Sequence, residues 1–165
     1  MADSFRVSSP QIQENARLAE EQVFNLYGCK GDNLSPALEW KNPPEGTRSF
    51  AVTINDLDVP AGKEWWHWII FNIPANVTSL VKGAGEPRAQ LAPHGAIQTR
   101  NDFGKAGYGG PCPPPGDKPH RYEFTVYALE IDKLPLDENT PAATVSYYLQ
   151  QNLIQKAVLR ATYSR

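Results

Sequence analysis

Two histidines and two aspartates are the residues of this sequence best placed to do chemistry. His67 lies among tryptophans in the apolar stretch EWWHWIIFNIP, and His120 opens another apolar stretch. Asp56 and Asp58 end a third, in the segment DLDVP. Strand ends and the loops after them are where sheet proteins usually build binding sites. Each residue alone is explained by a structural role, but polar groups at the ends of three strands together favour a shared pocket.

Three kinds of chemistry are compatible with these residues. Aspartate and histidine side chains are ligands for zinc, or for iron with a carboxylate, although DLD is also common in turns. Cys112 and His120 could form a nucleophilic pair, but Cys112 stands between two prolines and not at a helix N-terminus, which would lower its pKa. The glycines of GYGGPCPPPG, residues 107–116, allow backbone N–H groups to approach an anion. No nucleotide P-loop sequence is present.

Alternating apolar residues predict the strands that carry these groups. In SFAVTIND, Phe50, Val52 and Ile54 alternate with smaller residues, which predicts a half-buried strand with Asp56 on its buried side. HRYEFTVYALEI alternates in the same way from Tyr122 onward. FRV near the N-terminus and the end of GDNLSPALEW predict short strands.

The segment WWHWIIFNIP predicts a strand that is covered on both faces, because its apolar residues are continuous. Strict alternation places His67 with Ile69 and Phe71 on one face, and Trp66 with Trp68 on the other. His67 is therefore expected to be buried.

The C-terminal quarter predicts a helix followed by a strand. Thr140 is the expected N-cap, with Pro141 at the first helical position. Val145, Leu149 and Leu153 form an apolar stripe at helical spacing, and AVLRATYS returns to strand-like alternation. Residues 82–119 are rich in glycine and proline and predict a long, ordered, functional loop.

Composition narrows the class of protein. The 165 residues suit one β-rich α+β domain spanning 1–165, and a net charge of −2 without runs of basic residues argues against a nucleic-acid partner. No stretch is long and apolar enough for a membrane span, and the N-terminus does not resemble a signal peptide, so a cytoplasmic location is expected, or a periplasmic one if a signal peptide was trimmed. In that compartment Cys29 and Cys112 are expected to be free thiols, and an oxidising compartment would allow a bridge between their loops.

Five segments in this order resemble the phosphatidylethanolamine-binding protein family, most closely its bacterial Raf-kinase-inhibitor-like branch: GDNLSPALEW, DLDVP, WHWIIFNIP, NDFGKAGYGGPCPPPG and HRYEFTVYAL. The resemblance covers about residues 5–163. It implies a large, mainly antiparallel sheet packed on a smaller one, with few helices, one of them near the C-terminus, and a small anion-binding pocket at one end.

The resemblance also implies a set of ligand-binding residues. Protonated His67 and His120 would be donors to the anion together with the Tyr122 hydroxyl, and Cys112 would present its backbone N–H. The full set carried over from the motifs is Asp56, Asp58, Pro60, Trp65, His67, Gly110, Cys112, Pro114, His120 and Tyr122.

Three functions are consistent with this sequence. The first is non-enzymatic binding of a small anionic or phosphorylated ligand, without a cofactor or bound metal, and with regulation of a protein partner as an extension. The second is a protein-interaction module that inhibits a kinase or protease, and the third is a metal-assisted hydrolase using Asp56, Asp58, His67 and His120. Homodimerisation is compatible with the resemblance, but no interface is evident in the sequence.

Overall fold

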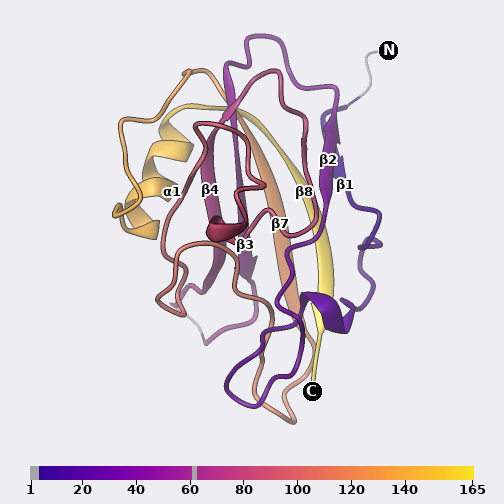
Figure 1. Ribbon diagram of the computed structural model, residues 1–165. Helices are drawn as coiled ribbons and strands as arrows, with labels where there is room; N and C mark the ends of the chain where they lie inside the picture. The colour runs from indigo at the N-terminus through magenta and orange to yellow at the C-terminus, as the bar shows by residue number, and fades with distance from the viewer. Residues whose placement is uncertain (1–3, 61–62) are drawn as a thin grey trace.

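The computed structural model describes residues 4–60 and 63–165 and is built mainly from antiparallel strands (Figure 1). One α-helix lies near the C-terminus of the described chain. The elements in chain order are β1 (Arg6–Ser8), the 3₁₀ turn η1 (Glu20–Gln22), β2 (Leu38–Lys41), β3 (Ser49–Asp56), β4 (Trp66–Pro74), β5 (Ser79–Leu80), the 3₁₀ turn η2 (Pro87–Ala89), β6 (Ile97–Gln98), β7 (His120–Leu129), α1 (Ala142–Gln151) and β8 (Leu153–Tyr163).

Two antiparallel sheets form the frame of the molecule. The large sheet has five strands in the order β6-β4-β3-β7-β8, and the small sheet has three in the order β1-β2-β5. Strand β3 lies between β4 and β7 and is antiparallel to both. The end of β3 therefore lies at the same edge of the sheet as the beginnings of β4 and β7. This topology brings together the polar groups that end three separate strands in the sequence.

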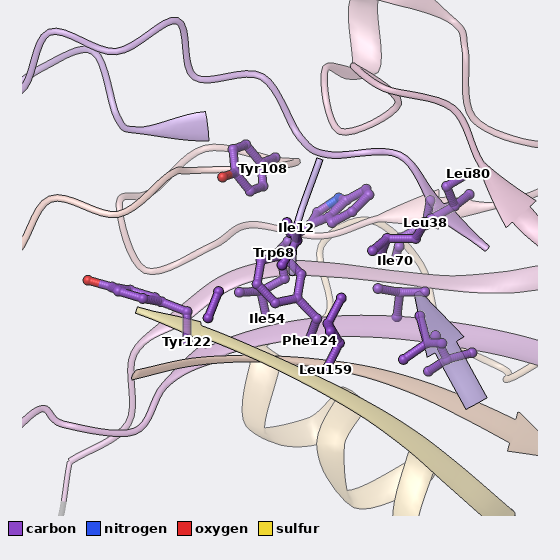
Figure 2. Close-up of a cluster of buried hydrophobic side chains, with 14 of the residues drawn as sticks. Ile12, Leu38, Ile54, Trp68, Ile70, Leu80, Tyr108, Tyr122, Phe124 and Leu159 are labelled. Atoms are coloured by element: carbon purple, nitrogen blue, oxygen red, sulfur yellow. The ribbon is translucent and has the colours of Figure 1, made fainter. Parts of the chain in front are cut away.

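Apolar residues cover both faces of the large sheet. On one face, Phe50, Val52 and Ile54 of β3 pack with residues of the small sheet such as Leu38 and Trp40. Part of this cluster is drawn in Figure 2. On the other face, helix α1 covers the sheet, and Val145 and Leu149 of the helix are fully buried (Figure 1). The predicted fold class is confirmed, and so is the prediction that β4 is covered on both sides.

An irregularity at the start of β4 changes the predicted orientation of His67. Ile54 pairs with Trp68, but Asn55 pairs with Trp66, so β4 has one extra residue at His67. Trp66 consequently packs on the helix side with Ile69 and Phe71, whereas His67 contacts Tyr122 of the opposite cluster. The prediction that His67 shares a face with Ile69 and Phe71 was wrong, because a β-bulge interrupts the alternation.

The helix begins and ends slightly differently from the prediction. Pro141, and not Thr140, is the N-cap of α1, and its carbonyl accepts hydrogen bonds from Thr144 and Val145. The Thr140 hydroxyl instead accepts a hydrogen bond from the N–H of Asp137 in the preceding turn. Leu153 begins strand β8 and does not continue the helical stripe. No helix in the described ranges, 4–60 and 63–165, is long and apolar enough to cross a membrane.

The expectation of two free thiols was wrong, because Cys29 and Cys112 form a disulfide. The expectation followed from an assumed reducing compartment. In the structure the segment that carries Cys29 lies against residues 111–116, since the N–H of Phe24 donates to the carbonyl of Pro111 at 3.0 Å. The sequence alone does not show this contact. The disulfide therefore ties the long loop 82–119 to a segment more than 80 residues earlier in the chain.

Candidate ligand-binding pocket

A cavity of about 490 Å³ lies at the edge of the large sheet where β3 ends and β4 and β7 begin. Its volume lies within the roughly 300–1,000 Å³ typical of small-molecule sites. Nine of the ten predicted ligand-binding residues line it, namely Asp56, Asp58, Pro60, Trp65, His67, Cys112, Pro114, His120 and Tyr122.

Gly110 is the predicted residue that does not line this cavity. Its N–H donates a hydrogen bond to Oδ1 of Asn33 at 2.7 Å and so is not directed to a ligand. A Cβ at this position would lie 2.0 Å from the carbonyl oxygen of Gln22. Glycine is required here for close packing of two loops.

Four further residues line the cavity and were not among the predicted ligand-binding residues: Val59, Phe103, Pro113 and Asp117. Val59 and Pro113 lie beside predicted residues in the chain. Phe103 and Asp117 belong to the long loop, whose path over the sheet cannot be derived from periodicity. Asp117 lies three residues before His120, and this proximity was the available signal for it.

His67 is held as a neutral ring. It is almost fully buried, and its Nδ1 lies 2.6 Å from the carbonyl oxygen of Gly109. A carbonyl can only accept, so Nδ1 carries the proton and Nε2 of the neutral ring is an acceptor. Burial lowers the pKa of His67 below 6.5 and outweighs the opposing effects of the Gly109 carbonyl and Asp56. A protonated His67 that donates to a bound anion stays a prediction.

His120 has the opposite electrostatic environment. Its Nδ1 lies 2.6 Å from Asp56 Oδ2, and its Nε2 lies 3.0 Å from Asp117 Oδ2. Burial is the largest single effect and opposes the charged form, but the hydrogen bonds to these two carboxylates and their charges together outweigh it and raise the pKa of His120 above 6.5. The cationic form of His120 predicted from the sequence agrees with this environment.

The carboxylates at the end of β3 are engaged by the protein itself. Asp56 also accepts a hydrogen bond from the N–H of Asp58 at 2.8 Å. Asp58 accepts three hydrogen bonds from the backbone and guanidinium of Arg121, and that guanidinium lowers the pKa of the Asp58 carboxyl. Asp56 therefore positions His120, and Asp58 fixes the turn after β3.

Tyr122 lies between the two histidines. Its ring contacts that of His67 edge-on, with centroids 5.2 Å apart, and is nearly parallel to that of His120 at 6.4 Å. Figure 2 shows its hydroxyl pointing away from the other labelled side chains of the apolar cluster. Burial, together with the charge of Asp56, raises the pKa of the Tyr122 hydroxyl, which is therefore a neutral donor at physiological pH.

The Tyr122 hydroxyl has no hydrogen-bond partner among the described residues. Only two other buried side-chain atoms in that part of the chain share this property, Trp40 Nε1 and Thr99 Oγ1, and neither residue lines the cavity. A buried polar group without a partner costs about 1–3 kcal/mol, so native structures normally satisfy it. The hydroxyl is thus an unsatisfied donor on a side chain that lines the cavity.

The opposite wall of the cavity is apolar and aromatic. Phe103 contacts Trp65 and His67 edge-on at 5.3 and 5.6 Å, and it stacks on Phe24 at 3.9 Å. Tyr27 extends this stack and is 73% exposed. The cavity therefore combines polar groups on the β3–β7 side with an aromatic surface that continues outward.

Cys112 lines the cavity and carries a backbone N–H. Residues 111–115 are otherwise all proline, so the Cys112 N–H is the single backbone donor of this segment. It forms no hydrogen bond with a partner in residues 4–60 or 63–165. The described residues contain no group of three or more histidine, cysteine or acidic side chains suited to a metal ion.

Known proteins have similar sequences and the same fold. The phosphatidylethanolamine-binding protein family pattern matches residues 8–164. The UPF0098 protein YbcL of Escherichia coli K12 is 49% identical over 162 residues, which cover 98% of this chain and 88% of that protein. The UPF0098 protein YbhB of the same organism is 41% identical over 159 residues, covering 96% and 99%.

Solved structures agree with these matches. The crystal structure of Escherichia coli YbcL, described as a new member of the mammalian PEBP family, superposes with a TM-score of 0.95 at 49% identity and covers 98% of both chains. A phosphatidylethanolamine-binding protein homologue from Chlamydia trachomatis gives a TM-score of 0.81 at 28% identity, again covering 98% of both chains. With a matching family pattern, close relatives and a shared fold, this chain belongs to the phosphatidylethanolamine-binding protein family.

Proposed function

We propose that this protein is a non-enzymatic binding protein whose pocket takes a small phosphorylated or other anionic ligand. The observation that carries the proposal is the buried, unpartnered hydroxyl of Tyr122 at the cavity. The family name, which refers to a phospholipid with a phosphate-containing head group, is consistent with it. Charged hydrogen bonds are worth about 1.5–3 kcal/mol each, so a few donors in a partly dry cavity suffice for binding.

The donors and acceptors of the cavity suit a ligand oxygen that carries or shares a proton. Tyr122 and the N–H of Cys112 donate. His67 Nε2 accepts in the unliganded chain, since Nδ1–H is directed to Gly109. A phosphate monoester, whose second pKa is about 6, can supply that proton or transfer it to the ring. Binding then takes up protons at neutral pH, and affinity rises as the pH falls from 7.5 to 6.

Isothermal titration of inorganic phosphate and phosphoethanolamine into wild type and Tyr122→Phe tests this proposal. The variant is expected to lose about tenfold or more in affinity, since a charged hydrogen bond disappears. Its unliganded stability should stay equal or rise slightly, because the hydroxyl has no partner to lose. Wild-type protein that binds neither probe at pH 6 or 7.5 would contradict the proposal.

Tyr127→Phe is the matched control. Tyr127 is also buried, but its hydroxyl is hydrogen-bonded to Thr53 at 3.2 Å on the helix side of the sheet. Removing this hydroxyl should lower stability by about 1 kcal/mol and leave phosphate affinity unchanged. A zinc salt in a parallel titration addresses the metal-assisted hydrolase: binding of zinc without binding of phosphate would favour that alternative.

The aromatic surface beside the cavity favours a second candidate function, a protein-interaction module. Leu26 and Tyr27 are 48% and 73% exposed, although they adjoin the well-packed pair Phe24 and Phe103. Exposed apolar groups gathered beside a pocket are typical of interaction sites. Partner binding that survives Tyr122→Phe but is lost in Tyr27→Ser would favour this function over ligand binding.

A further inference from the structure

We propose that Asp117 is an internal competitor for the ligand: its carboxylate occupies the His120 nitrogen that an anion would use, and a bound anion displaces it. This inference rests on the proposed anion-binding function. His120 Nε2 lies 3.0 Å from Asp117 Oδ2, and both residues line the cavity. His120 is the one cationic side chain among the described lining residues, so its outward N–H is the strongest donor that the cavity offers.

Of the two carboxylates on His120, only Asp117 is free to leave. The Asp56 side chain is 6% exposed and also accepts the N–H of Asp58, so its displacement would leave both that N–H and the buried His120 Nδ1 without an acceptor. The Asp117 side chain is 48% exposed and lies in a surface turn where its own N–H donates to Pro114. Water can solvate the Asp117 carboxylate after it rotates away from His120, so replacing it with an anion costs little free energy.

The exchange affects which anions bind well. Three carboxylates line the cavity, and those of Asp58 and Asp56 remain paired with Arg121 and His120. A displaced Asp117 becomes an unpaired negative charge at the mouth of the pocket. It repels the negative charge of a bound phosphate, whereas an ammonium group on the ligand can pair with it. Asp117 therefore weakens binding of inorganic phosphate more than that of phosphoethanolamine.

Isothermal titration at pH 6, with His120 protonated, tests the inference on wild type, Asp117→Asn and Asp117→Ala. Inorganic phosphate should bind Asp117→Asn about tenfold more tightly, because one like charge at close range is removed. Asp117→Ala, which also removes the competing acceptor, should bind it at least as tightly. Phosphoethanolamine should gain less than phosphate in both variants.

Asp132→Asn is the matched control, since it removes the same charge from the exposed pair with Arg48. Asp132 lies beyond the far end of the ten-residue strand β7, roughly 30 Å from His120. Phosphate affinity should not change in this variant.

Thermal unfolding of the same proteins without ligand separates competition from a structural role. Loss of the His120–Asp117 pair should leave the melting temperature unchanged or lower it, while phosphate affinity rises. Phosphate that binds wild type but binds Asp117→Asn equally or less tightly overturns the inference and leaves the proposed function standing. Phosphate that binds neither protein overturns both.

Discussion

His67 and His120 line the same cavity, yet their surroundings shift their pKa values in opposite directions. His67 has a carbonyl on one nitrogen and aromatic rings around it, so burial lowers its pKa. His120 is almost as buried, but a carboxylate faces each of its nitrogens, and its pKa is raised. The two pKa values shift in opposite directions because burial outweighs the single carbonyl contact at His67, whereas two carboxylates together outweigh burial at His120.

This difference gives the cavity a proton acceptor and a proton donor on either side of Tyr122. Pairs of titratable groups whose pKa values are pushed apart are typical of functional sites. Here the pair is built on two strands that flank β3, so its geometry depends on the large sheet. The long loop 82–119 supplies a hydrogen-bond partner for each ring: Gly109 bonds to His67, and Asp117 bonds to His120.

Opening the disulfide should have the largest effect, because it releases the loop that serves both histidines. Cys29 and Cys112 are 83 positions apart, and a crosslink closing a loop of that size stabilises by roughly 4.5 kcal/mol in the chain-entropy model. Urea unfolding of the Cys29→Ser/Cys112→Ser protein should show a loss of that order. Phosphate affinity should fall as well, since Cys112 lines the cavity.

Treatment with a reductant provides the control for this prediction. It should destabilise wild type and leave the double variant unchanged. A loss below about 1 kcal/mol in both experiments would show that hydrogen bonds such as that from Phe24 to Pro111 hold the loop without the crosslink.

Asp56→Ala should have the next largest effect, and it acts mainly on His120, to which Asp56 is hydrogen-bonded. The substitution leaves the imidazolium and the Asp58 N–H without a buried acceptor. Breaking a buried ion pair by removing one partner costs about 3 kcal/mol or more. Urea unfolding should show this loss, and the pKa of His120 measured by NMR should fall.

Asp58→Ala tests whether burial causes the effect. Asp58 belongs to the same DLD segment, but its partner Arg121 has a side chain that is 56% exposed. Exposed ion pairs contribute roughly 0–1 kcal/mol, so this variant should lose much less stability. Equal losses in the two variants would contradict the distinction between Asp56 and Asp58.

The strands of the large sheet could be predicted because alternation is a local property. Phe50, Val52 and Ile54 lie on one face as expected, and Asp56 follows them to the cavity. The strand is nevertheless buried on both faces, so the prediction that it is half-buried was wrong. The two-sided covering of β4 also followed from its continuous apolar residues. These features depend on the period of the strand and on burial, both of which can be read from a single segment.

Features that depend on two distant segments could not be predicted in this way. The bulge at His67 exists only relative to the pairing of β4 with β3. The neutral state of His67 depends on Gly109, and the disulfide depends on the approach of two loops. Gly110 was placed in the site by its motif, but its N–H bonds to Asn33 and its packing requires glycine. The sequence motifs thus predicted where the pocket lies, but the role of each residue depends on contacts with distant segments.

The smallest predicted effect concerns pH, and it tests the comparison of the two histidines directly. Histidine side-chain NMR across pH 4–9 should place the pKa of His120 above 6.5 and that of His67 below it. His120 then adds stability that is full below about pH 6.5 and is lost as the pH rises through its folded pKa. His67 favours folding above about pH 6.5, and this contribution is lost as the pH falls through its folded pKa.

Each pKa unit corresponds to about 1.4 kcal/mol, so the two contributions should be resolved by urea unfolding at several pH values. The stability of His120→Gln relative to wild type should improve as the pH rises, because wild type loses the imidazolium pair with Asp56 and Asp117. The stability of His67→Gln relative to wild type should improve as the pH falls, because wild type must then protonate a buried ring. Two histidines that titrate together near pH 6.5 would contradict the assignment of donor and acceptor, and phosphate binding would then require a different proton balance.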